Sequence, residues 1–318
     1  MPLHARTTRT IRFGAVAAAG IAAVAVCAAP AAWAADRTDA PASAASAPAA
    51  KVQAVDSPDQ AAAFWTPERM AAARPFGSAS GSGSADPVAA SAATTISVAQ
   101  QVAPVPHIGR LYFTNGGVSF WCSANVVQAT NGSTISTAAH CLSLDGVSTH
   151  DLAFTPAYED GTGPYGVWPI VAESITAGWE GNNADQAADA AFVITKPDAS
   201  GRTLQSVVGG SPVAFDRPYD ETGSVYGYPA AGRFDGQTLQ RCVGRVAFYF
   251  STQFQMDCDM NGGVSGGPVF EGDGPDGAQF AVEDARPTTG SRVIGPMWQS
   301  RVHAAYDSAE AADPGMFG

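Results

Sequence analysis

The sequence is poor in positive charge. Its 318 residues include 17 lysines and arginines against 29 aspartates and glutamates, which gives a formal net charge of −12. Proteins that bind nucleic acids rely on clustered lysine and arginine side chains to neutralise phosphates. A chain this acidic is therefore not expected to bind nucleic acid.

Long hydrophobic segments are absent beyond the N-terminus. Residues 1–35 carry three arginines and no acidic residue, and they include an apolar run over 13–29 and the small-x-small sequence AWA at 32–34. This run is too short and too rich in alanine for a comfortable membrane span, and a signal-peptidase pattern follows it. We therefore expect residues 1–34 to be a signal peptide, and the mature protein to be secreted without stable membrane association.

The cysteines are few and widely separated. Cys27 belongs to the expected leader, and the four that remain are Cys122, Cys141, Cys242 and Cys258. A zinc site would need close-set pairs such as C-x-x-C, which do not occur, so no metal is expected. An even number of cysteines in an exported chain predicts two disulfides.

Residues 35–102 are rich in alanine, serine, proline and glycine, which predicts a pro-region or linker without a core of its own. The stretch GSASGSGSADP (77–87) is typical of a flexible linker. Within 64–74, Thr66 could cap a helix that begins at Pro67. This helix is either a stray turn in a disordered spacer or part of a pro-segment that contacts the folded domain.

From residue 103 to 318 the composition and the hydrophobic pattern of the sequence change. Short apolar or alternating runs recur between clusters of glycine, proline, asparagine and aspartate, which predicts an all-β domain. Only 303–312 has the composition of a helix, no internal repeat is visible, and the span is long enough for two small β-barrels. The expected strands include the runs at 110–114, 118–127, 167–172, 190–195, 245–250 and 292–298.

Two stretches carry residues suited to chemistry. In ISTAAHCLSL (135–144), His140 could be a core histidine, a metal ligand or a catalytic base. In MNGGVSGGPVF (260–270), Ser265 lies between glycine pairs, so the N–H groups of Gly263 and Ser265 could point into one small concavity, as an oxyanion requires. A glycine-rich serine loop alone is weak evidence, because many turns have this composition.

A catalytic histidine also needs a carboxylate to orient it. Asp189 opens the apolar run DAAFVI, whereas Asp185 lies in the polar loop GNNADQ. Because an orienting acid works best when it is desolvated, Asp189 is the preferred partner of His140.

The order His140, Asp189, Ser265 is the order of the chymotrypsin-type proteases. The motifs STAAHC, DAAFV and GGVSGGPVF together resemble the three catalytic signatures of that family. The chain is most similar to the secreted bacterial trypsin-like and glutamyl-endopeptidase-like branch, with FTPAY (154–158) and GYP (227–229) as further matches, over about 106–300. The resemblance implies two Greek-key, six-stranded antiparallel β-barrels with a catalytic cleft between them, and a short C-terminal helix. It further implies a cofactor-free, monomeric serine endopeptidase that acts on polypeptides through an acyl-enzyme.

The same resemblance implies how the cysteines pair. In the family, the cysteine next to the catalytic histidine bonds back to the preceding strand, which here joins Cys141 to Cys122 and leaves Cys242 to pair with Cys258. Each closed loop is expected to contribute about 3 kcal/mol of stability.

The chain departs from the family next to the nucleophile and in the specificity pocket. Trypsin has an aspartate just before the serine, which pairs with a newly cut N-terminus; Val264 stands here, so residues 35–102 must act in another way. We expect them to be cut from a precursor somewhere between Gly77 and Pro106.

Asp259, six residues before Ser265, matches the acid of trypsin that binds arginine or lysine. Glu-specific relatives have a histidine on the pocket wall where this chain has Met297, so Glu specificity is disfavoured. Basic or bulky apolar residues remain as the preferred residue at the cleavage site, and arginine or lysine is favoured.

Two other functions fit parts of the pattern. The sequence GVSGG also matches the G-x-S-x-G elbow of esterases and lipases, but Gly-Gly-Pro follows, which is hostile to a helix, and the only downstream histidine is His303. The second alternative is an inactive, protease-like binding domain. The complete triad and both oxyanion donors argue against it, and labelling by a fluorophosphonate distinguishes the two.

Overall fold

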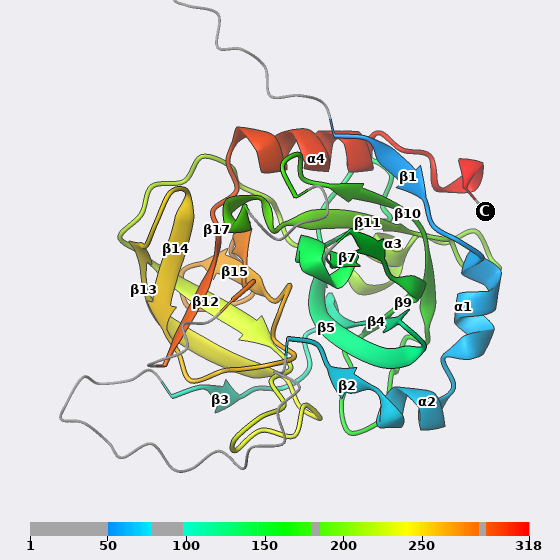
Figure 1. Ribbon diagram of the computed structural model, residues 1–318, viewed down its shortest axis with the longest axis horizontal. Coiled ribbons are helices and arrows are strands. Elements are labelled where there is room, and N and C mark those ends of the chain that lie inside the picture. The colour runs from blue at the N-terminus through cyan, green and yellow to red at the C-terminus, as the bar shows by residue number, and fades with distance from the viewer. Residues whose placement is uncertain (1–49, 78–97, 145, 180–184, 286–290, 318) are drawn as a thin grey trace, which may run out of the picture. The chain divides into compact units, whose positions relative to one another are not determined.

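The computed structural model describes residues 50–77, 98–144, 146–179, 185–285 and 291–317, all within one compact unit, Ala45–Gly318. Strands dominate this part of the chain, as the alternating and β-branched runs predict (Figure 1). No helix in the described ranges is long and apolar enough to cross a membrane.

Six antiparallel strands close into a first barrel, in the order β10–β11–β6–β5–β4–β9 and back to β10 (Figure 1). Leucine, isoleucine, valine and phenylalanine side chains from alternate strand positions fill its interior. The small hairpin of β7 (Ser143–Leu144) and β8 (Val147–Ser148) lies outside this ring. The six strands of the ring are β4 (Ile108–Asn115), β5 (Val118–Val126), β6 (Thr134–Thr137), β9 (His150–Pro156), β10 (Trp168–Ile175) and β11 (Ala191–Thr195).

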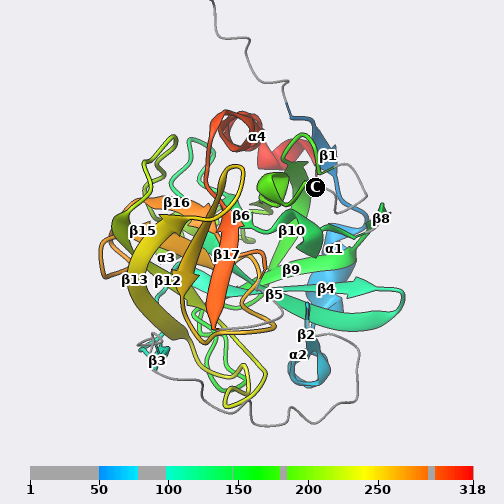
Figure 2. The ribbon, with the colours of Figure 1, turned by 60° about the vertical axis from the view of Figure 1, so that its left-hand side comes forward.

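A second sheet has the order β16–β15–β12–β13–β14–β17, and Figure 2 brings it forward. Its end strands meet only at isolated bridges, Ala281 with Met297 and Ala285 with Ile294, so it is a half-barrel where the first sheet is closed. The expected all-β, two-barrel architecture is confirmed, with this difference in closure. The strands are β12 (Glu221–Gly227), β13 (Gln240–Phe248), β14 (Gln253–Asp257), β15 (Pro268–Glu271), β16 (Gln279–Val282) and β17 (Arg292–Pro296).

The expected C-terminal helix is α4 (Ser300–Glu310), which packs Val302, Ala305 and Tyr306 against Phe192 of β11 and neighbouring apolar residues. After residue 103, the other short helical elements of the described ranges were not expected. They are α3 (Leu204–Val208) and the single 3₁₀ turns η1 (Ala139–Cys141), η2 (Gln186–Ala188) and η3 (Pro314–Met316).

The segment 50–77 packs onto the barrels, although its composition suggested a spacer. It forms β1 (Val52–Ala54), α1 (Pro58–Phe64), α2 (Pro67–Ala72) and β2 (Arg74–Pro75). β1 extends the first barrel beside β10, and β2 runs parallel to β5. Trp65, Met70 and Phe76 are buried, and these large side chains supply the apolar area that the rest of the region lacks.

The helix expected after Thr66 is present. The Thr66 side chain accepts a hydrogen bond from the backbone N–H of Arg69, and Pro67 occupies the first turn. Because Met70 on this helix is buried, the segment contacts the folded domain, which was the second of the two interpretations. Further along, β3 (Gln100–Gln101) pairs with β13, so the chain is anchored to the second sheet before residue 103.

Candidate active site

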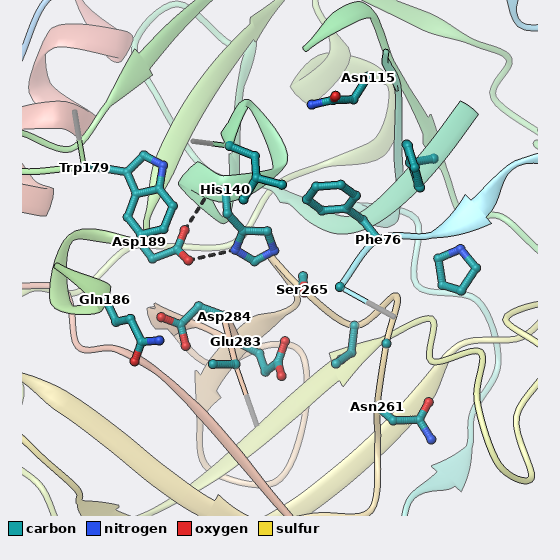
Figure 3. A pocket seen from close by; sticks show the side chains of 17 residues that line it. Phe76, Asn115, His140, Trp179, Gln186, Asp189, Asn261, Ser265, Glu283 and Asp284 are labelled. Carbon is teal, nitrogen blue, oxygen red and sulfur yellow. Dashed lines mark hydrogen bonds and ion pairs between the residues drawn. The ribbon is translucent and has the colours of Figure 1, made fainter. Parts of the chain in front are cut away.

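A cleft of about 620 Å³ lies where the two barrels and the N-terminal segment meet (Figure 3). The first barrel and its loops supply His140, Trp179 and Asp189, among others, and the second sheet and its loops supply Asn261, Ser265, Glu283 and Asp284. Pro75, Phe76 and Gly77 of the N-terminal segment form part of its lining.

The register of the first barrel brings His140 and Asp189 together. β6 and β11 are antiparallel neighbours, with Thr137 opposite Ala191. His140 follows the end of β6 and Asp189 precedes the start of β11, so residues 49 positions apart in sequence lie at the same end of one strand pair. Cys141 is bonded to Cys122 on β5, which ties the turn that carries His140 to the neighbouring strand.

Asp189 contacts His140 with both carboxylate oxygens. His140 Nδ1 lies 2.7 Å from Asp189 Oδ2, and the backbone N–H of His140 donates to Oδ1 at 2.8 Å. The two residues are only 8% and 3% exposed, so the contact is shielded from water. Asp185, the rival carboxylate, instead pairs with Arg301 at 2.7 Å on the surface.

Ser265 lies on the side of the His140 ring that faces away from Asp189 (Figure 3). Its loop is held between both barrels: Ser123 of β5 donates its N–H to the Ser265 carbonyl at 2.8 Å and its hydroxyl to the Gly263 carbonyl at 2.9 Å. Within the described ranges, the structure contains no hydrogen bond from Ser265 Oγ to the ring.

Two glycines make this loop possible. Gly263 and Gly266 have φ values of 98° and 79°, in the region that favours glycine. A Cβ on Gly263 would lie 2.6 Å from the Tyr228 carbonyl oxygen, and one on Gly266 would collide with Thr137 and Ser123. Glycine is therefore required at positions 263 and 266 by both backbone conformation and packing.

The two N–H groups expected to bind an oxyanion differ in their contacts. The N–H of Gly263 donates to the carbonyl oxygen of Phe76 at 3.1 Å. The N–H of Ser265 has no hydrogen-bond acceptor in the described part of the chain. One of the two expected oxyanion donors, the N–H of Gly263, is therefore already bonded to the carbonyl oxygen of Phe76.

Phe76 covers the reactive groups. Its ring stacks on the His140 ring, with centroids 5.7 Å apart and an interplanar angle of 21°, and its N–H donates to the Trp121 carbonyl at 2.9 Å. A Cβ built on the next residue, Gly77, would lie 3.5 Å from Ser265 Oγ. The backbone at 76–77 therefore lies directly against the serine and the histidine.

Sequence reasoning missed two acids of the cleft, Glu283 and Asp284. They are 2% and 7% exposed, directly after the apolar strand β16. The pKa of Asp284 is raised well above its usual range, first by burial and then by the charges of Asp189 and Glu283. Adjacent acids after an apolar run were the available signal, since buried strands seldom end in two carboxylates.

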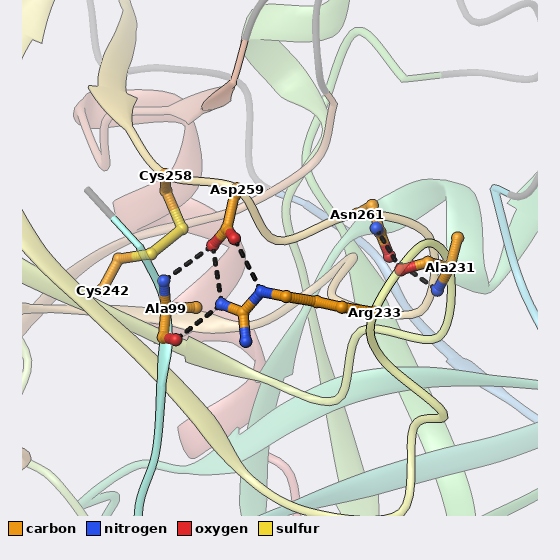
Figure 4. A network of polar contacts seen from close by, with 7 residues as sticks. All are labelled: Ala99, Ala231, Arg233, Cys242, Cys258, Asp259 and Asn261. Atoms are coloured by element: carbon orange, nitrogen blue, oxygen red, sulfur yellow. Dashed lines mark hydrogen bonds and ion pairs between the residues drawn. A yellow bond between two sulfur atoms is a disulfide. The ribbon is translucent and has the colours of Figure 1, made fainter. Parts of the chain in front are cut away.

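The two residues expected to form the specificity pocket are not among the described residues that line the cleft. Asp259 binds Arg233, with Nε 2.9 Å from Oδ2, and accepts the backbone N–H of Ala99 at 2.6 Å (Figure 4). Met297 is 1% exposed in the core of the second sheet. Counting back from Ser265 locates Asp259 in sequence, but its ion pair with Arg233 turns its side chain away.

A buried His–Asp pair, with a glycine-flanked serine beyond it at the junction of two β-barrels, defines the class of serine proteases with the chymotrypsin fold. No protein-family model matches the sequence, and no curated protein does. Solved structures do match.

The protease Anisep from Arthrobacter nicotinovorans is 35% identical, with 67% of this chain and 100% of that chain covered and a TM-score of 0.64. The thermostable serine protease AL20 from an extremophilic microorganism is 36% identical, with 65% and 98% covered and a TM-score of 0.63. A Glu endopeptidase, at 20% identity, 67% and 97% coverage and a TM-score of 0.55, shares the fold. The chain therefore belongs to the bacterial chymotrypsin-fold serine proteases.

Proposed function

We propose that this protein is a secreted serine endopeptidase that hydrolyses peptide bonds through His140, Asp189 and Ser265. The observation that carries the proposal is the two-point contact of Asp189 with His140, which leaves the other edge of the ring toward Ser265 (Figure 3). A surface histidine or a core histidine would not need a desolvated carboxylate on both its ring and its backbone.

The proposed reaction follows from this arrangement. Ser265 Oγ attacks the scissile carbonyl carbon while His140 Nε2 takes the hydroxyl proton, and Asp189 stabilises the imidazolium that forms. The N–H groups of Gly263 and Ser265 bind the negative oxygen of the tetrahedral intermediate. His140 then protonates the leaving amine, and water hydrolyses the acyl-enzyme by the same steps in reverse.

The precursor is proposed to be a zymogen. The Phe76 carbonyl accepts the hydrogen bond of Gly263 that a substrate oxyanion would need, and the Phe76 ring covers His140. This contact supports an inhibitory role for the pro-region 35–102. Such inhibition does not depend on the activation ion pair of trypsin, which Val264 could not form. The expected signal peptide, 1–34, lies outside the described residues, and so does the expected linker at 77–87 apart from Gly77.

Replacing the nucleophile tests the function. Ser265→Ala is expected to lower kcat for peptide hydrolysis by about 10⁴-fold or more and to abolish labelling by a fluorophosphonate, because no other group can form the acyl-enzyme. Ser200→Ala, at an exposed serine in a surface loop, is the matched control and should change neither.

Near-normal hydrolysis by Ser265→Ala would contradict the proposal. A wild-type protein that neither cleaves peptides nor reacts with the probe would instead support the binding-domain alternative. Rapid cleavage of simple esters with no cleavage of any peptide would favour the esterase.

A further inference from the structure

The side chain of Ser123 joins two backbone segments of the second sheet. Ser123 lies on β5 of the first barrel and is fully buried. Its Oγ accepts the N–H of Tyr228 at 2.9 Å, and its hydroxyl donates to the carbonyl of Gly263, also at 2.9 Å. Because an N–H can only donate and a carbonyl oxygen can only accept, the hydroxyl proton must point at Gly263. These two partners therefore fix the orientation of the hydroxyl.

The main chain of Ser123 holds the same loop at a second point. Its N–H donates to the carbonyl of Ser265 at 2.8 Å. One residue of the first barrel thus bonds to positions 263 and 265, the two positions whose N–H groups are expected to bind the oxyanion. The hydroxyl serves Gly263, and the backbone serves Ser265.

Gly263 needs a contact of this kind because its backbone is unusually free. Its φ is 98°, and it has no Cβ to restrict rotation. The peptide between Gly263 and Val264 is held at both edges: Ser123 binds its carbonyl, and its N–H donates to the carbonyl of Asn261 at 3.2 Å. Loss of the hydroxyl releases one of these edges and leaves a buried carbonyl without its partner.

The preceding peptide, which carries the N–H of Gly263, depends on the other partner of Ser123. Its carbonyl, that of Gly262, accepts the N–H of Ala230 at 2.8 Å. Ala230 lies two residues after Tyr228, whose N–H is bound to the Ser123 hydroxyl. With these contacts in place, the N–H of Gly263 points at a carbonyl oxygen, that of Phe76, at 3.1 Å. The direction of this N–H is therefore tied to Ser123 through both hydrogen bonds of its hydroxyl.

We propose that Ser123 is a positioning residue for the reaction, whose hydroxyl orients the N–H of Gly263 toward the oxyanion. The inference rests on the proposed function and adds to it a group that does not touch the substrate. An oxyanion donor stabilises the transition state only where its N–H points at the developing charge, so a small rotation of the Gly263 peptide slows the reaction. The effect is therefore on kcat, with little change in KM.

Ser123→Ala tests this role in the active enzyme produced from the full chain. For peptide hydrolysis, kcat should fall by about 10- to 100-fold, with KM within about twofold of the wild-type value. Ser136→Ala is the matched control, because its hydroxyl is also fully buried and also reaches the second sheet. The partners of that hydroxyl, the Asn125 carbonyl and Gln279 Oε1, lie outside the nucleophile loop, so kcat should stay nearly unchanged.

A second measurement separates the orientation of the oxyanion donor from a general loss of structure. It compares a trifluoromethyl ketone, made on a peptide that the enzyme cleaves, with the corresponding alcohol. Ser265 Oγ adds to the ketone carbon and its proton passes to His140, so the carbonyl oxygen becomes an oxyanion; the alcohol forms no such adduct. The preference for the ketone, measured as the ratio of the two inhibition constants, should fall by about 10- to 100-fold in Ser123→Ala and stay unchanged in Ser136→Ala.

A second variant covers the case in which Ser123→Ala fails to fold. Ser123→Cys keeps the shape of the side chain with a weaker donor and acceptor, so its preference for the ketone should lie below that of wild type. The same preference in wild type and in the Ser123 variants would overturn the inference, and so would an equal fall in Ser136→Ala. Either result leaves the proposed function standing as long as Ser265→Ala is inactive. A wild type that cleaves no peptide would contradict the proposed function, and the inference with it.

Discussion

The two barrels contribute to the cleft in different ways. The first is a closed ring, and it holds His140 and Asp189 at the ends of two paired strands. The second is a half-barrel, and it supplies Ser265 and Glu283 from the loops around β15 and β16. The proposed base and its orienting acid therefore belong to the first barrel, whereas the proposed nucleophile belongs to the second sheet and its loops.

The pairing of His140 with Asp189 and the placement of His140 relative to Ser265 therefore depend on different parts of the fold. The His140–Asp189 contact depends only on the register of β6 against β11, but the distance from His140 to Ser265 depends on how the barrels pack. Polar contacts between the barrels contribute to that packing. Ser123 bonds to the nucleophile loop, and Asn125 of the first barrel donates to Ser211 at 2.9 Å and to Gln279 of the second at 2.8 Å.

The largest effect is expected from the segment that bridges the barrels, since Phe76 bonds to Trp121 of the first and Gly263 of the second. In the unprocessed chain, Phe76→Ala should raise the rate at which a fluorophosphonate labels Ser265 by about 100-fold, because losing a buried phenylalanine costs about 3 kcal/mol or more. Arg74→Ala, at an exposed residue of the same segment, is the control and should have little effect. Equal labelling rates for wild type and Phe76→Ala would show that the segment does not block the site.

The disulfides allow a matched comparison of the two barrels. Cys122–Cys141 and Cys242–Cys258 close loops of similar length, with sequence separations of 19 and 16. Replacing either pair by alanines should lower the free energy of unfolding by about 3 kcal/mol. Only the first pair adjoins His140, so only its loss should also lower kcat/KM, by about tenfold. Denaturant unfolding and peptide hydrolysis measure the two effects, and equal activity losses would contradict the division of roles.

The smallest effect concerns Glu173 on β10 of the first barrel, where Gln53 of β1 pairs beside it. Burial raises the pKa of Glu173 to about 7. The folded state thus holds this proton more tightly than the unfolded state, so the stability from the neutral form is complete below the unfolded pKa and is lost as pH rises through about 7. Glu173→Gln should remove this loss and stabilise the protein at pH 8 by about 2 kcal/mol relative to wild type.

Thermal or denaturant unfolding at pH 4.5 and pH 8 checks this expectation. Glu159→Gln, at a partly exposed glutamate, is the control and should change stability little at either pH. An effect of Glu173→Gln that is the same at both pH values would mean that Glu173 does not titrate between them.

Local sequence patterns were sufficient for much of the architecture. Apolar alternation located the strands at 110–114 and 118–127, and Thr66 with Pro67 marked the start of α2. The helix α3 was missed because five residues carry too little periodicity to stand out. The packing of 50–77 was left as one of two open interpretations, because a composition averaged over 35–102 hides a few large apolar residues.

The acids near Ser265 show the limit most clearly. Asp259 was chosen by its distance in sequence from Ser265, but the direction of its side chain depends on Arg233, 26 positions away. Glu283 lies 18 positions beyond Ser265 and reaches the cleft because β16 pairs with β15, next to the nucleophile loop. Neither relation is visible without the strand pairing.

The sequence by itself determined the all-β class, the family resemblance and the residues of the candidate triad, because these depend on residue types and on their order along the chain. Only the tertiary structure decided which acids face the cleft, that the second sheet stays open, and that Phe76 covers His140. The physical reason is that each of these outcomes is a contact between distant segments. Ion pairs, strand pairing and burial set such contacts, and local sequence does not encode them.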